Sequence, residues 1–120
     1  MPFGTPGGDV QTQAMTQLIL NLVDFGMDLQ SAIEAPRVWS ESFPGSWDPH
    51  PYAPGVLQAE TRISAAVLDE LRDRGHDARE WQDGDWDHTH TSMCACRAEL
   101  SQRRYEGAAD PRRLAYAIGW

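Results

Sequence analysis

Two consecutive glycines, Gly7 and Gly8, lie directly before a stretch that predicts a helix. Adjacent backbone N–H groups without side-chain obstruction, backed by the positive end of a helix dipole, form a site for a developing negative charge. Such a site suits a bound anion or the oxyanion of a reaction intermediate. Glycine pairs before helices are also typical of ordinary tight turns, so spacing alone leaves both interpretations of Gly7 and Gly8 open.

The segments that must position this pair include three expected helices. The cluster Gly4-Thr5-Pro6-Gly7-Gly8 predicts a sharp turn, because glycine permits positive φ and proline restricts it. Each helix is expected after a residue that favours the N-cap position. The first helix is expected over 11–25, with Asp9 before it and Gly26 as its stop, and the second over 29–35, with Asp28 before it and Pro36 after it. The third is expected to begin at the cap Ser64 and to end at Gly75.

Short strands are expected between and after the later helices. Their ranges are 37–39, 56–60, 77–81 and 93–98. The proline-rich segment 42–54 predicts a long irregular connection, and the tail from Tyr105 to Trp120 ends on apolar and aromatic residues that should dock on another surface. Because so few strands close a sheet poorly, the sheet should need partners from elsewhere.

Several motifs of this sequence, taken in order, resemble the C-terminal part of the small subunit of γ-glutamyltransferases. They are the turn Gly4 to Gly8, the helix with Asn21-Leu22-Val23-Asp24, Gly26-Met27, Ala32-Ile33-Glu34-Ala35-Pro36-Arg37, Arg74-Gly75-His76, and Gly107-Ala108-Ala109-Asp110-Pro111-Arg112-Arg113. Together they cover nearly the whole chain and are far more specific than any single motif. The resemblance identifies residues 1–120 as a single partial domain of such a subunit.

The resemblance implies a fold, an activity and a pair of site residues. The fold is α+β, part of the four-layer αββα sandwich of N-terminal-nucleophile hydrolases, made by a large and a small subunit cut from one precursor. In this family the N-terminal threonine of the small subunit attacks the γ-glutamyl carbonyl of glutathione or a related amide, and its α-amine serves as the base. The oxyanion pair, and so the catalytic assignment here, falls on Gly7 and Gly8. No cofactor and no metal are implied.

This sequence departs from the family pattern before the glycine turn. The family's nucleophilic threonine, cleavage site and substrate-clamping residues precede that turn, where this sequence has only Met1-Pro2-Phe3. Thr89-His90 superficially matches the threonine-histidine of the cleavage point but follows the turn, so we reject it. We therefore expect a fragment that is inactive alone and whose partners are the large subunit and the N-terminal part of the small subunit. Substrate preference and localisation depend on residues outside this sequence.

Two alternatives come from other classes of protein. One is a non-catalytic binding or assembly module that covers its apolar surface by self-association. The other is a small zinc protein with four candidate ligands: His88, His90, Cys94 and Cys96. These side chains converge only if the chain turns at 91–93, a segment without the residues typical of turns, which disfavours the zinc interpretation. Four acidic residues lie close together in the sequence: Glu80, Asp83, Asp85 and Asp87. Their spacing is not that of a calcium-binding loop, so they predict a solvated loop.

The composition excludes several other kinds of chemistry. All 10 basic residues are arginine, and the absence of lysine rules out Schiff-base chemistry and a P-loop. The net charge of −8 disfavours nucleic-acid binding, and no apolar run approaches the roughly 18 residues of a membrane span. We expect Arg112 and Arg113 to pair with carboxylates and helix C-termini rather than bind phosphate.

Overall fold

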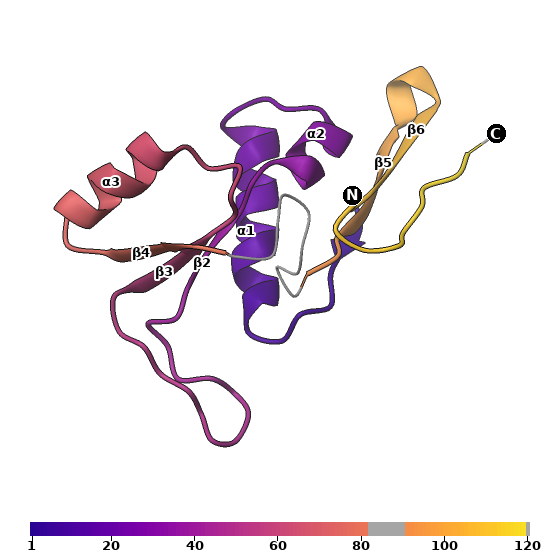
Figure 1. Ribbon diagram of the computed structural model, residues 1–120. Coiled ribbons are helices and arrows are strands. Elements are labelled where there is room, and N and C mark those ends of the chain that lie inside the picture. The colour runs from indigo at the N-terminus through magenta and orange to yellow at the C-terminus, as the bar shows by residue number, and fades with distance from the viewer. Residues whose placement is uncertain (82–90, 120) are drawn as a thin grey trace. The chain divides into compact units, whose positions relative to one another are not determined.

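The structure is a computed structural model that describes residues 1–81 and 91–119. The chain forms two compact units, one made of Met1–Ala35 together with His88–Trp120, the other of Pro36–Asp87. The second unit is therefore inserted into the sequence of the first. Each unit has its own three-stranded sheet and at least one helix (Figure 1). Helices and strands in both units agree with the expected α+β class, whereas a single partial domain over 1–120 stays a prediction.

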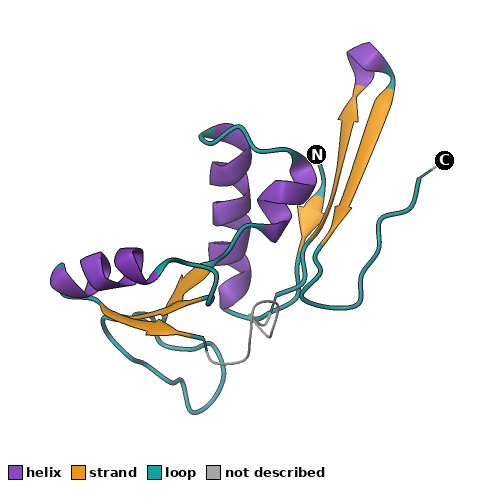
Figure 2. Ribbon diagram, turned by 45° about the horizontal axis from the view of Figure 1, so that its top comes forward, coloured by secondary structure: helices purple, strands orange, loops and turns teal. Residues whose placement is uncertain are grey.

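The sheet of the first unit is antiparallel. Its strands are β1 (Phe3–Gly4), β5 (Cys94–Glu99) and β6 (Arg104–Ala109), in the order β1-β5-β6. A 3₁₀ turn, η1 (Leu100–Gln102), joins β5 to β6, and Arg103 then adopts a left-handed φ of 51°. Figure 2 shows β5 and β6 as a long hairpin with η1 at its tip.

Two helices pack against this sheet: α1 (Val10–Val23) and α2 (Leu29–Glu34). Ala95 and Ala108 pair directly across β5 and β6, and their small side chains allow the helices to approach the sheet. Ala14 and Leu18 lie one helical turn apart and so face the same way. The buried cluster contains Ala14, Leu18, Leu29, Ala32, Ile33, Met93, Ala95 and Ala108.

The expected helices of this unit are confirmed, with different ends. The first helix stops at Val23 rather than Phe25, because the Phe25 N–H donates to the Leu20 carbonyl and Gly26 takes a left-handed φ of 64°. Asp28 caps α2 as expected, since its side chain accepts from the Ser31 N–H at 3.0 Å. Asp9 precedes α1 but makes no side-chain cap bond to it.

The strand β6 corrects the expectation that the chain from Tyr105 onward is a tail. In β6 Ala108 alone is buried, so the segment lacks the apolar alternation that would predict a strand. Its pairing with β5, from Cys94↔Ala109 to Glu99↔Arg104, holds it through the backbone instead. β6 is therefore a strand because it pairs with β5, not because of its own sequence pattern.

The second unit is a mixed sheet with one helix. Its elements are β2 (Val38–Ser40), β3 (Val56–Ala59), α3 (Ala65–Asp73) and β4 (Asp77–Glu80). β2 runs antiparallel to β3, and β4 runs parallel to β3, so α3 is the crossover that parallel strands require. These elements match the expected strands and third helix closely, and 42–54 is irregular as expected.

The core of the second unit lies under α3. Leu68 is fully buried against Ala59 and Ala78. The ring of Trp39 in β2 meets that of Trp81, directly after β4, edge to face with centroids 4.7 Å apart. These contacts give the inserted segment a hydrophobic core of its own.

Candidate oxyanion turn and its supports

The glycine pair connects β1 to α1. Gly7 has a φ of 132° and Gly8 a φ of 57°, in the region that residues with a Cβ rarely adopt. The Val10 N–H donates to the Gly7 carbonyl at 3.3 Å, and the Gln11 N–H donates to the Gly8 carbonyl at 3.1 Å. The two glycines thus form the entry to a 14-residue helix and lie at the positive end of its dipole.

The N–H groups of the two glycines differ in what they bind. Within residues 1–81 and 91–119, the Gly7 N–H donates no hydrogen bond. The Gly8 N–H faces the side-chain amide of Gln11. With the amide oxygen oriented toward Gly8, this oxygen accepts a hydrogen bond from the Gly8 N–H at 3.2 Å. In the same orientation the Gln11 nitrogen donates to the Thr5 carbonyl at 3.3 Å. An anion bound to both glycine N–H groups must therefore displace the Gln11 oxygen from Gly8.

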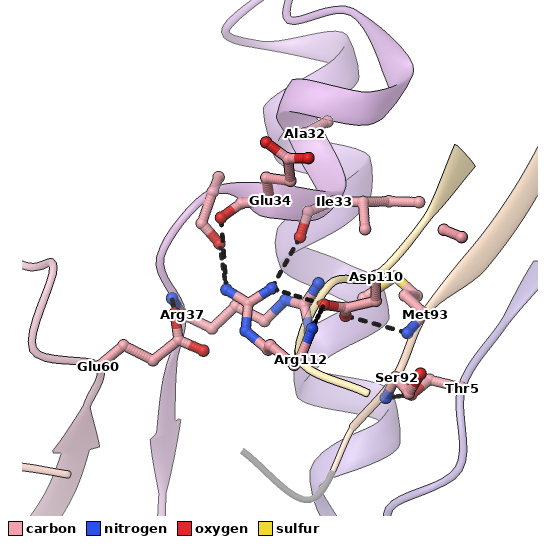
Figure 3. A network of polar contacts seen from close by, with 12 residues as sticks. Thr5, Ala32, Ile33, Glu34, Arg37, Glu60, Ser92, Met93, Asp110 and Arg112 are labelled. Carbon is pink, nitrogen blue, oxygen red and sulfur yellow. Dashed lines mark hydrogen bonds and ion pairs between the residues drawn. The ribbon is translucent and has the colours of Figure 1, made fainter. Parts of the chain in front are cut away.

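Thr5 ties the turn to the chain that enters β5. Its hydroxyl oxygen accepts from the Ser92 N–H at 2.8 Å and donates to the Pro6 carbonyl at 2.7 Å. Immediately before Thr5, β1 pairs with β5 through the backbone. The Thr5 side chain therefore binds Ser92 at the point where the backbone leaves the sheet for the turn (Figure 3).

The residue after Ser92 is held by a buried carboxylate. The Met93 N–H donates to Asp110 Oδ2 at 3.0 Å, and the Asp110 N–H donates to the Met93 carbonyl at 2.9 Å. Thr91, Met93 and Asp110 are all buried, with at most 1% of their surface exposed. The half-buried Ser92 therefore lies between two buried residues, Thr91 and Met93, the second of which is bound by Asp110 in both directions.

Arg112 links this carboxylate to the end of α2. Its Nη1 donates to Asp110 Oδ1 and to the Ile33 carbonyl, each at 3.0 Å, and its Nη2 donates to the Ala35 carbonyl at 2.9 Å (Figure 3). The last carbonyls of a helix have no partner inside the helix, so a guanidinium with several donors suits them well. The predicted pairing of Arg112 with a carboxylate and a helix C-terminus is confirmed. The same pairing stays a prediction for Arg113, which is exposed.

The other predicted site residues do not gather around the glycine turn. Cys94 and Cys96 are exposed on β5, and His88 and His90 lie outside the described residues, as does the rejected Thr89. Within 1–81 and 91–119, no three histidine, cysteine or acidic side chains are close enough to hold a metal ion. Of the acidic group, Glu80 ends β4, and Asp83, Asp85 and Asp87 lie outside the described part.

Three supports of the turn are absent from the sequence-based expectations: the Thr5 hydroxyl, the Gln11 amide and the Asp110 carboxylate. Thr5 and Asp110 belong to motifs that carry the family resemblance, so the motifs mark them without indicating what they bind. Gln11 has no comparable signal, because a glutamine in the first turn of a helix is common on any surface. Across the described residues, no helix has the length and apolar character needed to cross a membrane.

Comparison with known proteins shows to which family the chain belongs. A sequence model described as gamma-glutamyltranspeptidase matches residues 1–120. The glutathione hydrolase-like YwrD proenzyme of Bacillus subtilis is 30% identical over 98% of this chain and 21% of its own length. The acylase ACY 1 proenzyme of Pseudomonas sp. strain SE83 is 41% identical over 62% of this chain and 11% of its own. The chain thus spans about a fifth of the length of the first of these relatives.

A solved structure extends the likeness to the fold. Gamma-glutamyltranspeptidase from Pseudomonas nitroreducens, complexed with L-DON, superposes with a TM-score of 0.74 at 22% identity, over 98% of this chain and 54% of its own. The α+β architecture described above is therefore shared with that protein. The sequence model that matches residues 1–120 places the chain in a family of N-terminal-nucleophile hydrolases. The chain belongs to the gamma-glutamyltranspeptidase family.

Proposed function

We propose that Gly7 and Gly8 bind the oxyanion in an acyl-transfer site of the gamma-glutamyltranspeptidase type. The observation that carries the proposal is the left-handed conformation of both glycines at the N-terminus of α1, where the Gly7 N–H binds no described residue. The Gly7 N–H is already oriented and needs no reorganisation when charge develops on the substrate oxygen, whereas the Gly8 N–H exchanges the Gln11 oxygen for that of the substrate. The turn therefore favours the transition state over the neutral carbonyl.

In the proposed reaction the nucleophile is a threonine supplied by another part of the enzyme. Its hydroxyl oxygen attacks the amide carbonyl, its α-amine takes the proton, and the carbonyl oxygen becomes an anion at the turn. The C–N bond then breaks as the proton passes to the leaving amine, which gives an acyl ester. Water or an amino acid cleaves that ester and regenerates the threonine. Gly7 and Gly8 stabilise the anion in both halves of this cycle.

The proposed substrates are γ-glutamyl amides such as glutathione, or related acyl amides. This choice rests on the relatives, which are called glutathione hydrolase-like and acylase proenzymes. The partners are the large subunit and the N-terminal part of the small subunit, which would supply the nucleophile and the groups that clamp the substrate. We accordingly propose that the 120-residue chain has no turnover by itself.

A chimera tests the role of the glycines. In what we call the YwrD chimera, residues 1–120 replace the matching part of the Bacillus subtilis proenzyme. The chimera should release a chromogenic aniline from its γ-glutamyl anilide. Alanine keeps the backbone N–H but rarely adopts a φ of 132°, so Gly7→Ala should move this N–H away from the oxyanion. We expect the substitution to lower kcat by about 10²–10³, as when an oxyanion donor is lost. Gly8→Ala should act in the same direction but less strongly, because a φ of 57° is less hostile to alanine than 132°.

The matched control is Gly26→Ala, which has a similar left-handed φ of 64° at the other end of α1 and open space for a Cβ. It carries the same backbone strain away from the turn, and kcat should stay near that of the unsubstituted chimera. Equal losses in Gly8→Ala and Gly26→Ala would show that strain, not the anion site, controls activity. Turnover by the 120-residue chain above its own Gly7→Ala variant would contradict the proposed inactivity.

A self-associating module is the second candidate, favoured by an exposed apolar groove in the first unit. It lies on the sheet between the hairpin and the C-terminal segment, and its lining includes Phe3, Cys96, Tyr105, Tyr116 and Ile118. Tyr105, Tyr116 and Ile118 are each more than three quarters exposed. Size-exclusion chromatography with light scattering decides this: a stable dimer that Tyr105→Ser and Ile118→Ser dissociate would support the module, and a monomer would exclude it.

A further inference from the structure

The glycine turn has little rigidity of its own. Two successive glycines have wide conformational freedom, and Pro6 before them offers no N–H for a hydrogen bond. An oxyanion site works only when its donors are held within a fraction of an ångström of the productive position. Something outside the turn must therefore hold Gly7 and Gly8 in place.

The hydroxyl of Thr5 is the group placed to do this. Its oxygen bonds on one side to the Pro6 carbonyl, inside the turn, and on the other to the Ser92 N–H, which lies 87 positions away in the sequence. Ser92 directly precedes Met93, whose backbone is bound in both directions by the buried Asp110. A single side-chain oxygen thus joins the turn to a backbone segment that the buried Asp110 holds.

We propose that Thr5 is a positioning residue for the Gly7–Gly8 turn, acting through its hydroxyl on the Ser92 N–H. The inference rests on the proposed oxyanion function and deepens it. Thr5 does not touch the reacting atoms; it fixes where the glycine N–H groups point. The Gln11 amide, which binds the Thr5 carbonyl and the Gly8 N–H, closes the turn from the helix side.

Amide hydrogen exchange on the full 120-residue chain, followed by NMR, tests the structural step without any activity. Thr5→Val removes the hydroxyl and keeps the shape, and it should raise the exchange rate of the Ser92 amide about tenfold. The Gly7 and Gly8 resonances should shift and broaden in the same variant. Thr5→Ser keeps the oxygen, so all three amides should remain within about twofold of the unsubstituted chain.

The matched control is Thr16→Val, which removes an exposed hydroxyl bonded only locally, to the Thr12 carbonyl of α1. It should leave the Ser92, Gly7 and Gly8 amides unchanged. The proposal is overturned if Thr5→Val accelerates Ser92 exchange while Gly7 and Gly8 do not respond. It is equally overturned if Thr5→Ser behaves like Thr5→Val, because the hydroxyl would then be irrelevant.

Kinetics of the YwrD chimera separate positioning from the function itself. A positioning role predicts that Thr5→Val lowers kcat about tenfold with KM within about twofold, and that Thr5→Ser restores kcat. If Gly7→Ala is harmless there, the oxyanion function fails even though the exchange result stands. If Gly7→Ala lowers kcat and Thr5→Val does not, the positioning role alone fails. Should the chimera not assemble, the exchange experiment still decides whether Thr5 holds the turn.

Discussion

Arg112 Nη1 lies 3.0 Å from Asp110 Oδ1, and neither side chain is exposed to solvent. Removing one partner of a buried ion pair leaves an uncompensated charge in a region without water. We expect Arg112→Met to lower the free energy of unfolding by about 3–5 kcal/mol. Urea denaturation followed by circular dichroism measures this change.

The neighbouring arginine provides the control for that experiment. Arg113 carries the same charge one position later and is exposed, so Arg113→Met should change the free energy of unfolding by no more than about 0.5 kcal/mol. Similar effects of the two substitutions would mean that Arg112 acts through general charge rather than through Asp110 and the end of α2.

A second prediction concerns the core of the inserted unit. Leu68 of α3 is 0% exposed, so Leu68→Ala should destabilise the chain by about 2–5 kcal/mol through lost burial and a residual cavity. Val67, the preceding residue, is 47% exposed, and Val67→Ala should stay within about 0.5 kcal/mol. Thermal unfolding by calorimetry compares the two, and equal losses would contradict the packing of α3 described here.

A third prediction is the pH dependence of the α2 cap. Hydrogen bonds from the Ser31 side chain and N–H lower the pKa of Asp28 below its ordinary value of 3.8. Because the folded pKa is the lower one, this contribution to stability is present above pH 3.8 and is lost as the pH falls through the folded pKa. The difference in unfolding free energy between the unsubstituted chain and Asp28→Asn should therefore shrink on acidification. A difference that is constant down to strongly acidic pH would show that the carboxylate is not the group responsible.

A fourth prediction separates stability from activity at the glycine turn. Gln11→Glu places a carboxylate beside the Gly8 N–H, where it suits the helix dipole but competes with an oxyanion. In the YwrD chimera, kcat should fall by at least about tenfold, whereas the unfolding temperature should not decrease. Thr12→Glu adds the same charge one residue later at an exposed position and should leave kcat nearly unchanged. A loss of similar size in both variants would point to general electrostatics instead.

The helices of this chain could be predicted because their signals are local. Asp28 and Gly26 mark a start and an end within a few residues of the helices they delimit. In each case the residues next to the helix end were enough to predict where the helix begins or ends.

The remaining features depend on residues far apart in the sequence. The strand Arg104–Ala109 has no apolar alternation and exists because β5 pairs with it. The family resemblance singled out Gly7 and Gly8 as the candidate site, and their left-handed backbone is compatible with that assignment. No local rule, however, links Thr5 to the Ser92 N–H. The sequence therefore predicts the glycine turn but not the hydrogen bond between Thr5 and Ser92 that holds it.

The insertion of the second unit has a consequence for synthesis. Thr5 and Ser92 are separated by 87 positions, and β1 likewise pairs with a strand beyond the insertion. At about 5–20 residues per second, the ribosome needs roughly 4–17 s to make the chain between them. During that interval the glycine turn has no Ser92 to bind, while the inserted unit already contains all of its own strands. The turn proposed to do the chemistry is thus among the last parts of the chain to become ordered.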